Sequence, residues 1–333
     1  MTAIAVGQHR ANSLDSRGFF PIRISVLRLD VATGFDLYFL ADKQRSFVLY
    51  RSHNLPFTEA TRCRLVENSV TEVFARNDQR SLYNKYIEAN IASIMADPNT
   101  PPTEKAGVIY STGQSLVKDL LEDPRAGDLM ARSHSLVENT AGFLFADRAN
   151  FGHLLKVSSF DYYTYTHSVN VFVFTVSLAN WMGYDIETAQ IIGNGALLHD
   201  LGKSRIDPTI VNCPGKLSKE QWDSMKCHPM YGYELLLEQG CTNKIVLDMA
   251  LSHHEKLNGK GYPEGLANGQ IERHVRIATV SDIFDALTTR RSYKAAMGSF
   301  PALRLMRDEM QDELDQEIMR AFVFMMSGAT AKN

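Results

Sequence analysis

The sequence predicts a chain of two parts, a small α+β domain followed by a larger all-helical domain. Short β-rich runs occupy residues 21–29, 35–41 and 45–51, with turn-forming residues between them. Apolar residues recur at helical spacing from residue 79 onward, and no convincing strand follows residue 151. The length of 333 residues also exceeds the roughly 150 residues of a typical single domain.

The segment DPNTPPT at residues 97–103 is the clearest linker in the chain. We expect an N-terminal α+β regulatory domain of unknown ligand at 1–97, a linker with connecting helices at 98–150, a helical domain at 151–327 and a tail at 328–333. Among the connecting helices, an apolar stripe runs from Ile109 to Leu121, and a further helix is expected at 128–145. Such a stripe forms either a bundle core or a homodimer interface.

Composition excludes several classes of protein. The apolar share of 44% and the charged share of 22% are ordinary for a folded domain. A formal charge of only −3 argues against binding of long nucleic acid through a broad basic face. No apolar run reaches the roughly 20 residues of a membrane span. The 4 cysteines form no CxxC pair and no signal peptide is recognised, so we expect a reducing, cytoplasmic setting.

A set of histidines and aspartates in the helical part indicates a metal centre. Its members are His167, His199, Asp200, His228, His253, His254 and Asp282. The first, the second and the fourth of the five histidines each continue the apolar stripe of a different predicted helix, which directs three imidazoles inward. A single histidine in such a place is more often a hydrogen-bonded core residue. Burying the whole set without a cation would cost several kcal/mol, whereas iron, manganese, zinc or nickel would accept these ligands.

Four motifs in the same region resemble those of the HD-GYP family, a branch of the HD metal-dependent phosphohydrolases. They are HDLGK at 199–203, CHP at 227–229, HHEKLNGKGYP at 253–263 and SDIFDAL at 281–287. The resemblance covers about half of the chain. It implies that the helical part is an HD-type catalytic domain that binds two or three metal ions, often iron, and hydrolyses the bacterial messenger cyclic di-GMP.

The resemblance implies that the same seven side chains are the metal ligands, with Asp200 bridging two ions. Family members with three metals have a glutamate four residues before the first histidine, and this chain has Tyr163 there. The departure favours two divalent ions over three, with iron as the first expectation and manganese, nickel or zinc as alternatives. It also favours the linear product pGpG over complete hydrolysis to GMP.

Substrate contacts are expected from residues of three segments. Lys203 lies one helical turn after Asp200 and can stabilise charge on a phosphate, although a solvated lysine is the alternative. The resemblance places Arg291 and Lys294 at the phosphates of the ligand. Gly261 and Tyr262 belong to a turn that would form one wall of the cleft. Because the corresponding loop of the family docks on GGDEF domains, such proteins are possible partners.

Glu255 and Asp285 are expected to hold ligand imidazoles in orientation from outside the metal centre, although either could serve as a structural charge. The leading hypothesis is a phosphodiesterase in which a metal-bridging hydroxide attacks cyclic di-GMP. One alternative is a cyclic dinucleotide receptor with little turnover. Another is a phosphodiesterase for a different cyclic dinucleotide, such as cyclic GMP-AMP.

Overall fold

The structure is a computed structural model that describes residues 18–41, 46–158, 164–289 and 296–328. The chain divides into two compact units, Met1–Val108 and Ile109–Asn333. The first unit contains a β-sheet with short helices and the second is helical, so the predicted two-part fold is confirmed. The finer domain boundaries given above stay predictions.

The first unit is built on a four-stranded antiparallel sheet in the order β1-β6-β3-β4. These strands are β1 (Phe19–Arg23), β6 (Glu72–Arg76), β3 (Leu37–Ala41) and β4 (Ser46–Arg51), and a smaller pair joins β2 (Val31–Ala32) to β5 (Pro56–Phe57). The sequence did not predict β6, although this strand pairs on both sides. Its three central residues are all buried, so it lacks the polar alternation by which a half-exposed strand is recognised.

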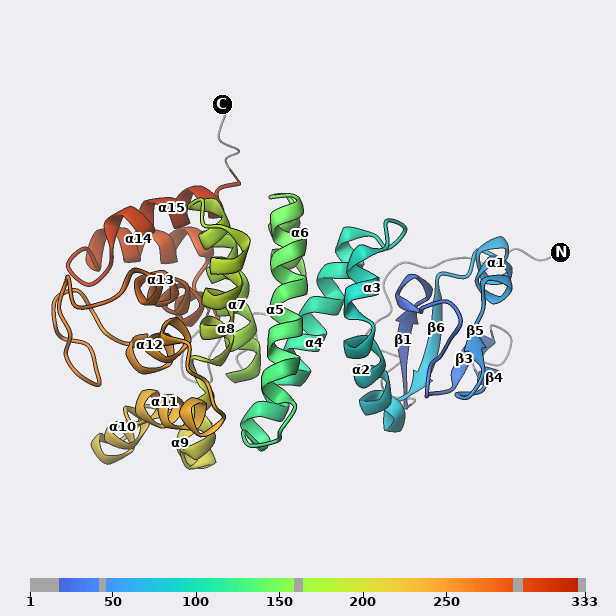
Figure 1. Cartoon of the computed structure of the whole chain (residues 1–333), viewed down its shortest axis with the longest axis horizontal. Helices are drawn as coiled ribbons and strands as arrows, with labels where there is room; N and C mark the ends of the chain where they lie inside the picture. The colour runs from blue at the N-terminus through green and yellow to red at the C-terminus, as the bar shows by residue number, and fades with distance from the viewer. Residues whose placement is uncertain (1–17, 42–45, 159–163, 290–295, 329–333) are drawn as a thin grey trace. The chain divides into compact units, whose positions relative to one another are not determined.

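Three helices complete the sheet-containing unit: α1 (Glu59–Glu67), α2 (Arg80–Ala89) and α3 (Ile91–Ala96). Tyr83 of α2 packs edge-on against Phe20 and Phe35, which fixes this helix beside the sheet (Figure 1). The continuous helical pattern over residues 79–97 is interrupted at Asn90. Its side chain donates a hydrogen bond to the carbonyl of Tyr86, an alternative to continued helix that asparagine favours.

The second unit consists of helices throughout its described residues, with one isolated β-bridge between Asn258 and Ala267. Helix α4 (Pro102–Glu122) begins in the first unit and continues into the second. The remaining helices are α5 (Leu129–Ala146), α6 (Asn150–Val157), α7 (Thr164–Trp181), α8 (Ile186–Leu198), α9 (Pro208–Val211), α10 (Lys219–Met225), α11 (His228–Glu238), α12 (Lys244–Ser252), α13 (Arg273–Thr288), α14 (Ser299–Glu309) and α15 (Gln316–Met326).

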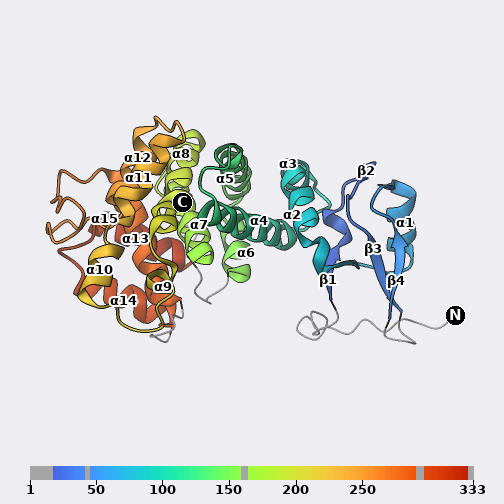
Figure 2. The same cartoon turned by 90° about the horizontal axis from the view of Figure 1, so that it is seen from below.

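Helices α7 and α8 form the centre of this unit, between α5 on one side and α12 and α13 on the other (Figure 1 and Figure 2). The rings of Phe174, Phe284 and Phe322 meet edge to face and join α7, α13 and α15 in the core. Helix α7 is buried on nearly all sides, and its buried residues include threonine, serine and asparagine as well as apolar side chains. No helix in the described part of the chain is both long and apolar enough to cross a membrane.

Candidate metal centre

Five elements of the helical unit bring the seven predicted ligands together. His167 lies on α7 and Asp282 on α13. His199 and His253 directly follow the last residues of α8 and α12, each is followed by the next ligand in the chain, and α11 begins at His228. The donor atoms form two groups, Asp200 with His228, His253 and His254, and His167 with His199 and Asp282. Within each group all atoms lie within 4.8 Å of one another.

Asp200 faces both groups with different oxygen atoms. Its Oδ1 lies 3.3 Å from Nε2 of His228, and its Oδ2 lies 3.4 Å from Nε2 of His199 and 3.6 Å from Nε2 of His167. Among the described residues, neither Oδ1 of Asp200 nor Nε2 of His199 has a hydrogen-bond partner, although both are buried. Buried polar atoms without partners are costly. Cations on either side of Asp200 would satisfy them, so the residues present fit a metal centre.

Backbone carbonyls fix the tautomer of three ligand imidazoles in their neutral form. Nδ1 of His199 lies 2.7 Å from the carbonyl of Ala196, and Nδ1 of His228 lies 2.7 Å from the carbonyl of Met225. His253 makes the corresponding contact within its own helix. A carbonyl only accepts, so each Nδ1 carries the hydrogen and each Nε2 keeps a lone pair. Two of these lone pairs, on His228 and His253, face each other across 3.2 Å, which a cation would relieve.

His167 lies between two carboxylates. Its Nδ1 is 2.7 Å from Oδ2 of Asp285, and its Nε2 is 3.1 Å from Oδ1 of Asp282. Burial favours the neutral ring, but the hydrogen bonds and charges of these two aspartates outweigh burial and raise the pKa of His167 to about 10. The negative potential that holds this proton would equally hold a metal ion in its place. Asp285 thus makes the contact with a ligand imidazole that the sequence led us to expect.

Three other ligands, Asp200, Asp282 and His253, have the charge states that metal binding requires. Burial would raise the pKa of Asp200, but the charges of Lys203 and His199 outweigh it and hold the pKa well below the usual range of a carboxyl group. The pKa of Asp282 is also lowered, chiefly by His167 against the effect of burial. Burial, reinforced by the neighbouring imidazoles, lowers the pKa of His253 well below its usual value. The site therefore offers anionic carboxylates and a neutral imidazole.

Gly202 allows the close helix crossing that places His228 against Asp200. A Cβ atom at this position would lie 1.9 Å from the carbonyl oxygen of His228 and 2.4 Å from the backbone nitrogen of Gly232. Any side chain at residue 202 would therefore push α11 away from the segment that carries Asp200. Gly202 is the glycine of the motif HDLGK, and the sequence alone does not reveal that the helix crossing requires it.

The loop after the paired histidines is held by Glu255, and here the structure corrects a prediction. Among the described residues, the buried carboxylate of Glu255 accepts hydrogen bonds from the backbone N–H groups of residues 264, 265 and 266 and not from a histidine. Gly261 packs so closely on this turn that a Cβ atom would lie 2.4 Å from Cα of Glu255. Both residues therefore shape the loop, which presents Tyr262 at 4.7 Å between ring centroids from His254.

We predict that Glu255→Gln loosens this loop without removing metal. The new amide would direct a donor at backbone donors, and a buried N–H without its acceptor costs about 1–3 kcal/mol. Thermal unfolding should show this loss of stability, and limited proteolysis should cut faster within residues 256–268. The exposed neighbour Glu264 is the matched control, because Glu264→Gln changes the charge equally. Equal melting temperatures for the two variants would contradict the assignment.

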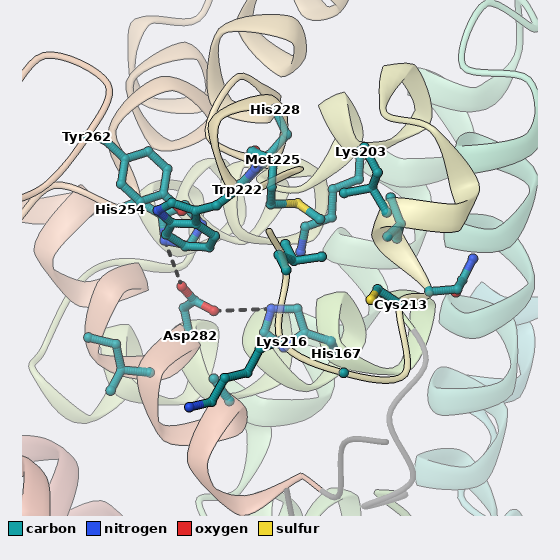
Figure 3. Close-up of a pocket in the computed structure, with 17 residues that line it drawn as sticks. His167, Lys203, Cys213, Lys216, Trp222, Met225, His228, His254, Tyr262 and Asp282 are labelled. Atoms are coloured by element: carbon teal, nitrogen blue, oxygen red, sulfur yellow. Dashed lines mark hydrogen bonds and ion pairs between the residues drawn. The ribbon is translucent and has the colours of Figure 1, made fainter. Parts of the chain in front are cut away.

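A pocket of about 570 Å³ opens over the metal centre (Figure 3). Four ligand side chains, His167, His228, His254 and Asp282, contribute to its lining. The far wall is formed by residues 210–217 and by the end of α10, neither of which the sequence singled out. The sequence marks this wall only by the turn CPGK at 213–216, which precedes α10.

Two predicted phosphate contacts, Arg291 and Lys294, lie outside the described residues, as does Tyr163. Their roles and the number of metal ions therefore stay predictions. Lys203 lies where expected, with Nζ 2.5 Å from Oδ2 of Asp200, and it lines the pocket together with Tyr262.

Comparison with known proteins agrees with this description. Residues 166–318 match the HD domain family model. A cyclic di-GMP phosphodiesterase of Pseudomonas aeruginosa is 32% identical over 220 residues, 66% of this chain and 53% of that protein. The 3'3'-cGAMP-specific phosphodiesterase 3 of Vibrio cholerae is 33% identical over 218 residues, 62% of this chain and 47% of that protein. The chain thus spans about half the length of these curated relatives.

A solved structure shares the fold. The HDG"Y"P protein of Bdellovibrio bacteriovorus superposes with a TM-score of 0.64 at 19% identity, over 93% of this chain and 100% of that one. The fold, the family-model match and the motifs agree. The helical unit of this chain is therefore a domain of the HD family, as its HD-GYP motifs predicted.

Proposed function

We propose that this chain is a metal-dependent phosphodiesterase that hydrolyses a cyclic dinucleotide, with cyclic di-GMP as the first expected substrate. The observation that carries the proposal is the position of Asp200, whose two oxygens face two groups of imidazole and carboxylate donors beneath an open pocket. The pocket volume of about 570 Å³ lies within the usual range for small-molecule sites.

Divalent cations bound by the two groups would polarise the phosphoryl group and make a water molecule more acidic. The chain's own residues supply positioning and charge. Lys203, beside Asp200, donates to the phosphate oxygens as negative charge develops on them. The carbonyl-anchored histidines hold their Nε2 lone pairs fixed, so that little reorganisation is needed during the reaction.

Aromatic rings at the pocket mouth suit a nucleobase. Trp222 is half exposed and meets Tyr262 edge to face, with 6.0 Å between ring centroids. Burial raises the pKa of the Tyr262 hydroxyl, so this group stays a hydrogen-bond donor. Lys216 lines the same pocket and can neutralise a second phosphate. A ligand with two bases and two phosphates would use all of these groups.

We predict that Trp222→Ala raises the KM for cyclic di-GMP by roughly tenfold, since stacking of one base on an aromatic ring contributes about 1–3 kcal/mol. The metal content should not change, because Trp222 supplies no donor atom to either group of the metal centre. Steady-state kinetics with metal analysis would check both expectations. Phe324→Ala, which removes an exposed ring of α15 outside the pocket, is the control. A KM unchanged by Trp222→Ala would remove this residue from the binding site.

The experiment that tests the function is a turnover assay on metal-reconstituted protein with cyclic di-GMP and 3'3'-cGAMP in parallel. Many equivalents of linear pGpG per chain would support the proposal, and chromatography would separate that product from GMP. Faster hydrolysis of 3'3'-cGAMP, for which one relative is named, would reassign the substrate. Tight binding without linear product would instead indicate a receptor.

The predicted cellular context belongs to the same proposal. Docking of GGDEF-domain proteins on the loop at 257–266, a homodimer through the connecting helices and a cytoplasmic setting are each expected from the sequence. Iron as the metal and a centre of two ions are likewise expected from the sequence. Elemental analysis of protein purified without oxygen would test the last two expectations together.

A further inference from the structure

A chain of buried hydrogen bonds links helix α4 to the metal centre. The hydroxyl of Tyr110 on α4 donates to Oδ1 of Asn170, at 2.9 Å. Nδ2 of Asn170 donates to Oδ1 of Asp285, at 2.7 Å. Oδ2 of Asp285 in turn lies 2.7 Å from Nδ1 of His167. All four side chains are buried, with Asp285 at 0% exposure, so the chain of hydrogen bonds is shielded from water.

The direction of each hydrogen bond is fixed by chemistry. An ionised Asp285 can only accept, so the amide nitrogen of Asn170 must face it and the amide oxygen must face Tyr110. For the same reason Nδ1 of His167 carries a hydrogen, and Nε2 faces Asp200 and Asp282, where a metal ion would take the place of its proton. The orientation of the first ligand imidazole thus depends on a carboxylate that Asn170 holds in place at 2.7 Å, with a longer hydrogen bond of 3.1 Å from the hydroxyl of Thr289 to the same oxygen.

We propose that Tyr110 and Asn170 are positioning residues of the metal centre, which fix the imidazole of His167 through Asp285. The inference rests on the proposed function for the existence of the metal centre, but it concerns metal affinity and not the substrate. It also assigns a role to α4. The residue of this helix that takes part, Tyr110, lies within the second compact unit.

The contact is specific enough to be tested by removing one oxygen atom. Tyr110→Phe keeps the ring in the core and deletes the hydroxyl that orients Asn170. We expect the dissociation constant for Mn²⁺, measured on metal-free protein by electron paramagnetic resonance, to rise roughly threefold to tenfold, the ratio that one buried neutral hydrogen bond typically contributes. Asp285→Asn, which alters the direct partner of His167, should raise it by roughly 10–100-fold.

A matched control separates positioning from general destabilisation. The hydroxyl of Ser133 on α5 donates to Oδ1 of Asn194 at 3.1 Å, and it is equally buried. Ser133→Ala therefore removes the same type of hydrogen bond, hydroxyl to asparagine, away from the ligands. Its thermal unfolding without metal should resemble that of Tyr110→Phe, while its Mn²⁺ affinity should equal that of the wild type.

A double-mutant cycle completes the test. If Tyr110 acts through Asp285, Tyr110→Phe should weaken Mn²⁺ binding little further in the Asp285→Asn background. Full additivity, an unchanged affinity in Tyr110→Phe or an equal loss in Ser133→Ala would each overturn the proposal. Absence of cyclic dinucleotide hydrolysis by wild-type protein that binds Mn²⁺ would refute the proposed function alone, because the Mn²⁺ titration uses no substrate.

Discussion

Asp200→Ala is expected to abolish metal binding and phosphodiesterase activity together. The two oxygens of Asp200 face different donor groups, so its loss removes a ligand from both sites at once. Replacing an outer-shell partner of a metal ligand typically costs about 10–100-fold in affinity, and loss of a shared direct ligand should exceed the upper end of that range. Elemental analysis of the purified variant, with its turnover of cyclic di-GMP, measures both effects.

The control for this variant is another aspartate beside a histidine. Oδ2 of Asp248 lies 3.2 Å from Nε2 of His274, away from the pocket, and Asp248→Ala should leave the metal content unchanged. Asp200→Ala also removes the ion pair with Lys203, so thermal unfolding of the metal-free variant is compared with that of the wild type to separate loss of a ligand from loss of the fold. If Asp200→Ala retained a full complement of metal, the assignment of the centre would be wrong.

Much of the candidate site could be predicted because its residues follow rules that act along the chain. His167 continues an apolar stripe of its helix, while His199 and His253 stand at helix ends, and periodicity reveals both kinds of position. The HD-GYP motifs identify the remaining ligands, which are Asp200, His228, His254 and Asp282. The meeting of α7, α8, α11, α12 and α13 at one place follows from packing, which the sequence pattern alone does not specify.

What the sequence did not reveal depends on contacts between distant segments. Trp222 lines the pocket because α10 folds back over the ligands, and nothing in its neighbours indicates that contact. Glu255 adjoins two ligands in the sequence, which suggested that it supports them, yet its carboxylate is directed to the loop. Asn170 appeared to be one polar interruption of an apolar helix, and only its partners Tyr110 and Asp285 explain it.

Lys203→Met is expected to slow turnover by roughly 10²–10³-fold, the usual effect of removing one donor that stabilises developing negative charge. Lys203 lies in the pocket with Nζ 2.5 Å from Asp200, so it is close to the place where a phosphate would meet the metal ions. Methionine preserves the length of the side chain and much of its packing. Because the lost charge acts mainly in the transition state, kcat should fall far more than KM rises.

Metal content distinguishes this role from a structural one. Lys203 is a cation beside Asp200, so its removal should leave metal binding intact or strengthen it, while turnover is lost. Lys216→Met is the matched control, because it removes the same charge from the opposite wall of the pocket and should raise KM with little change in kcat. Loss of metal from Lys203→Met, or normal turnover by it, would show that this lysine supports the fold of the site and not the reaction.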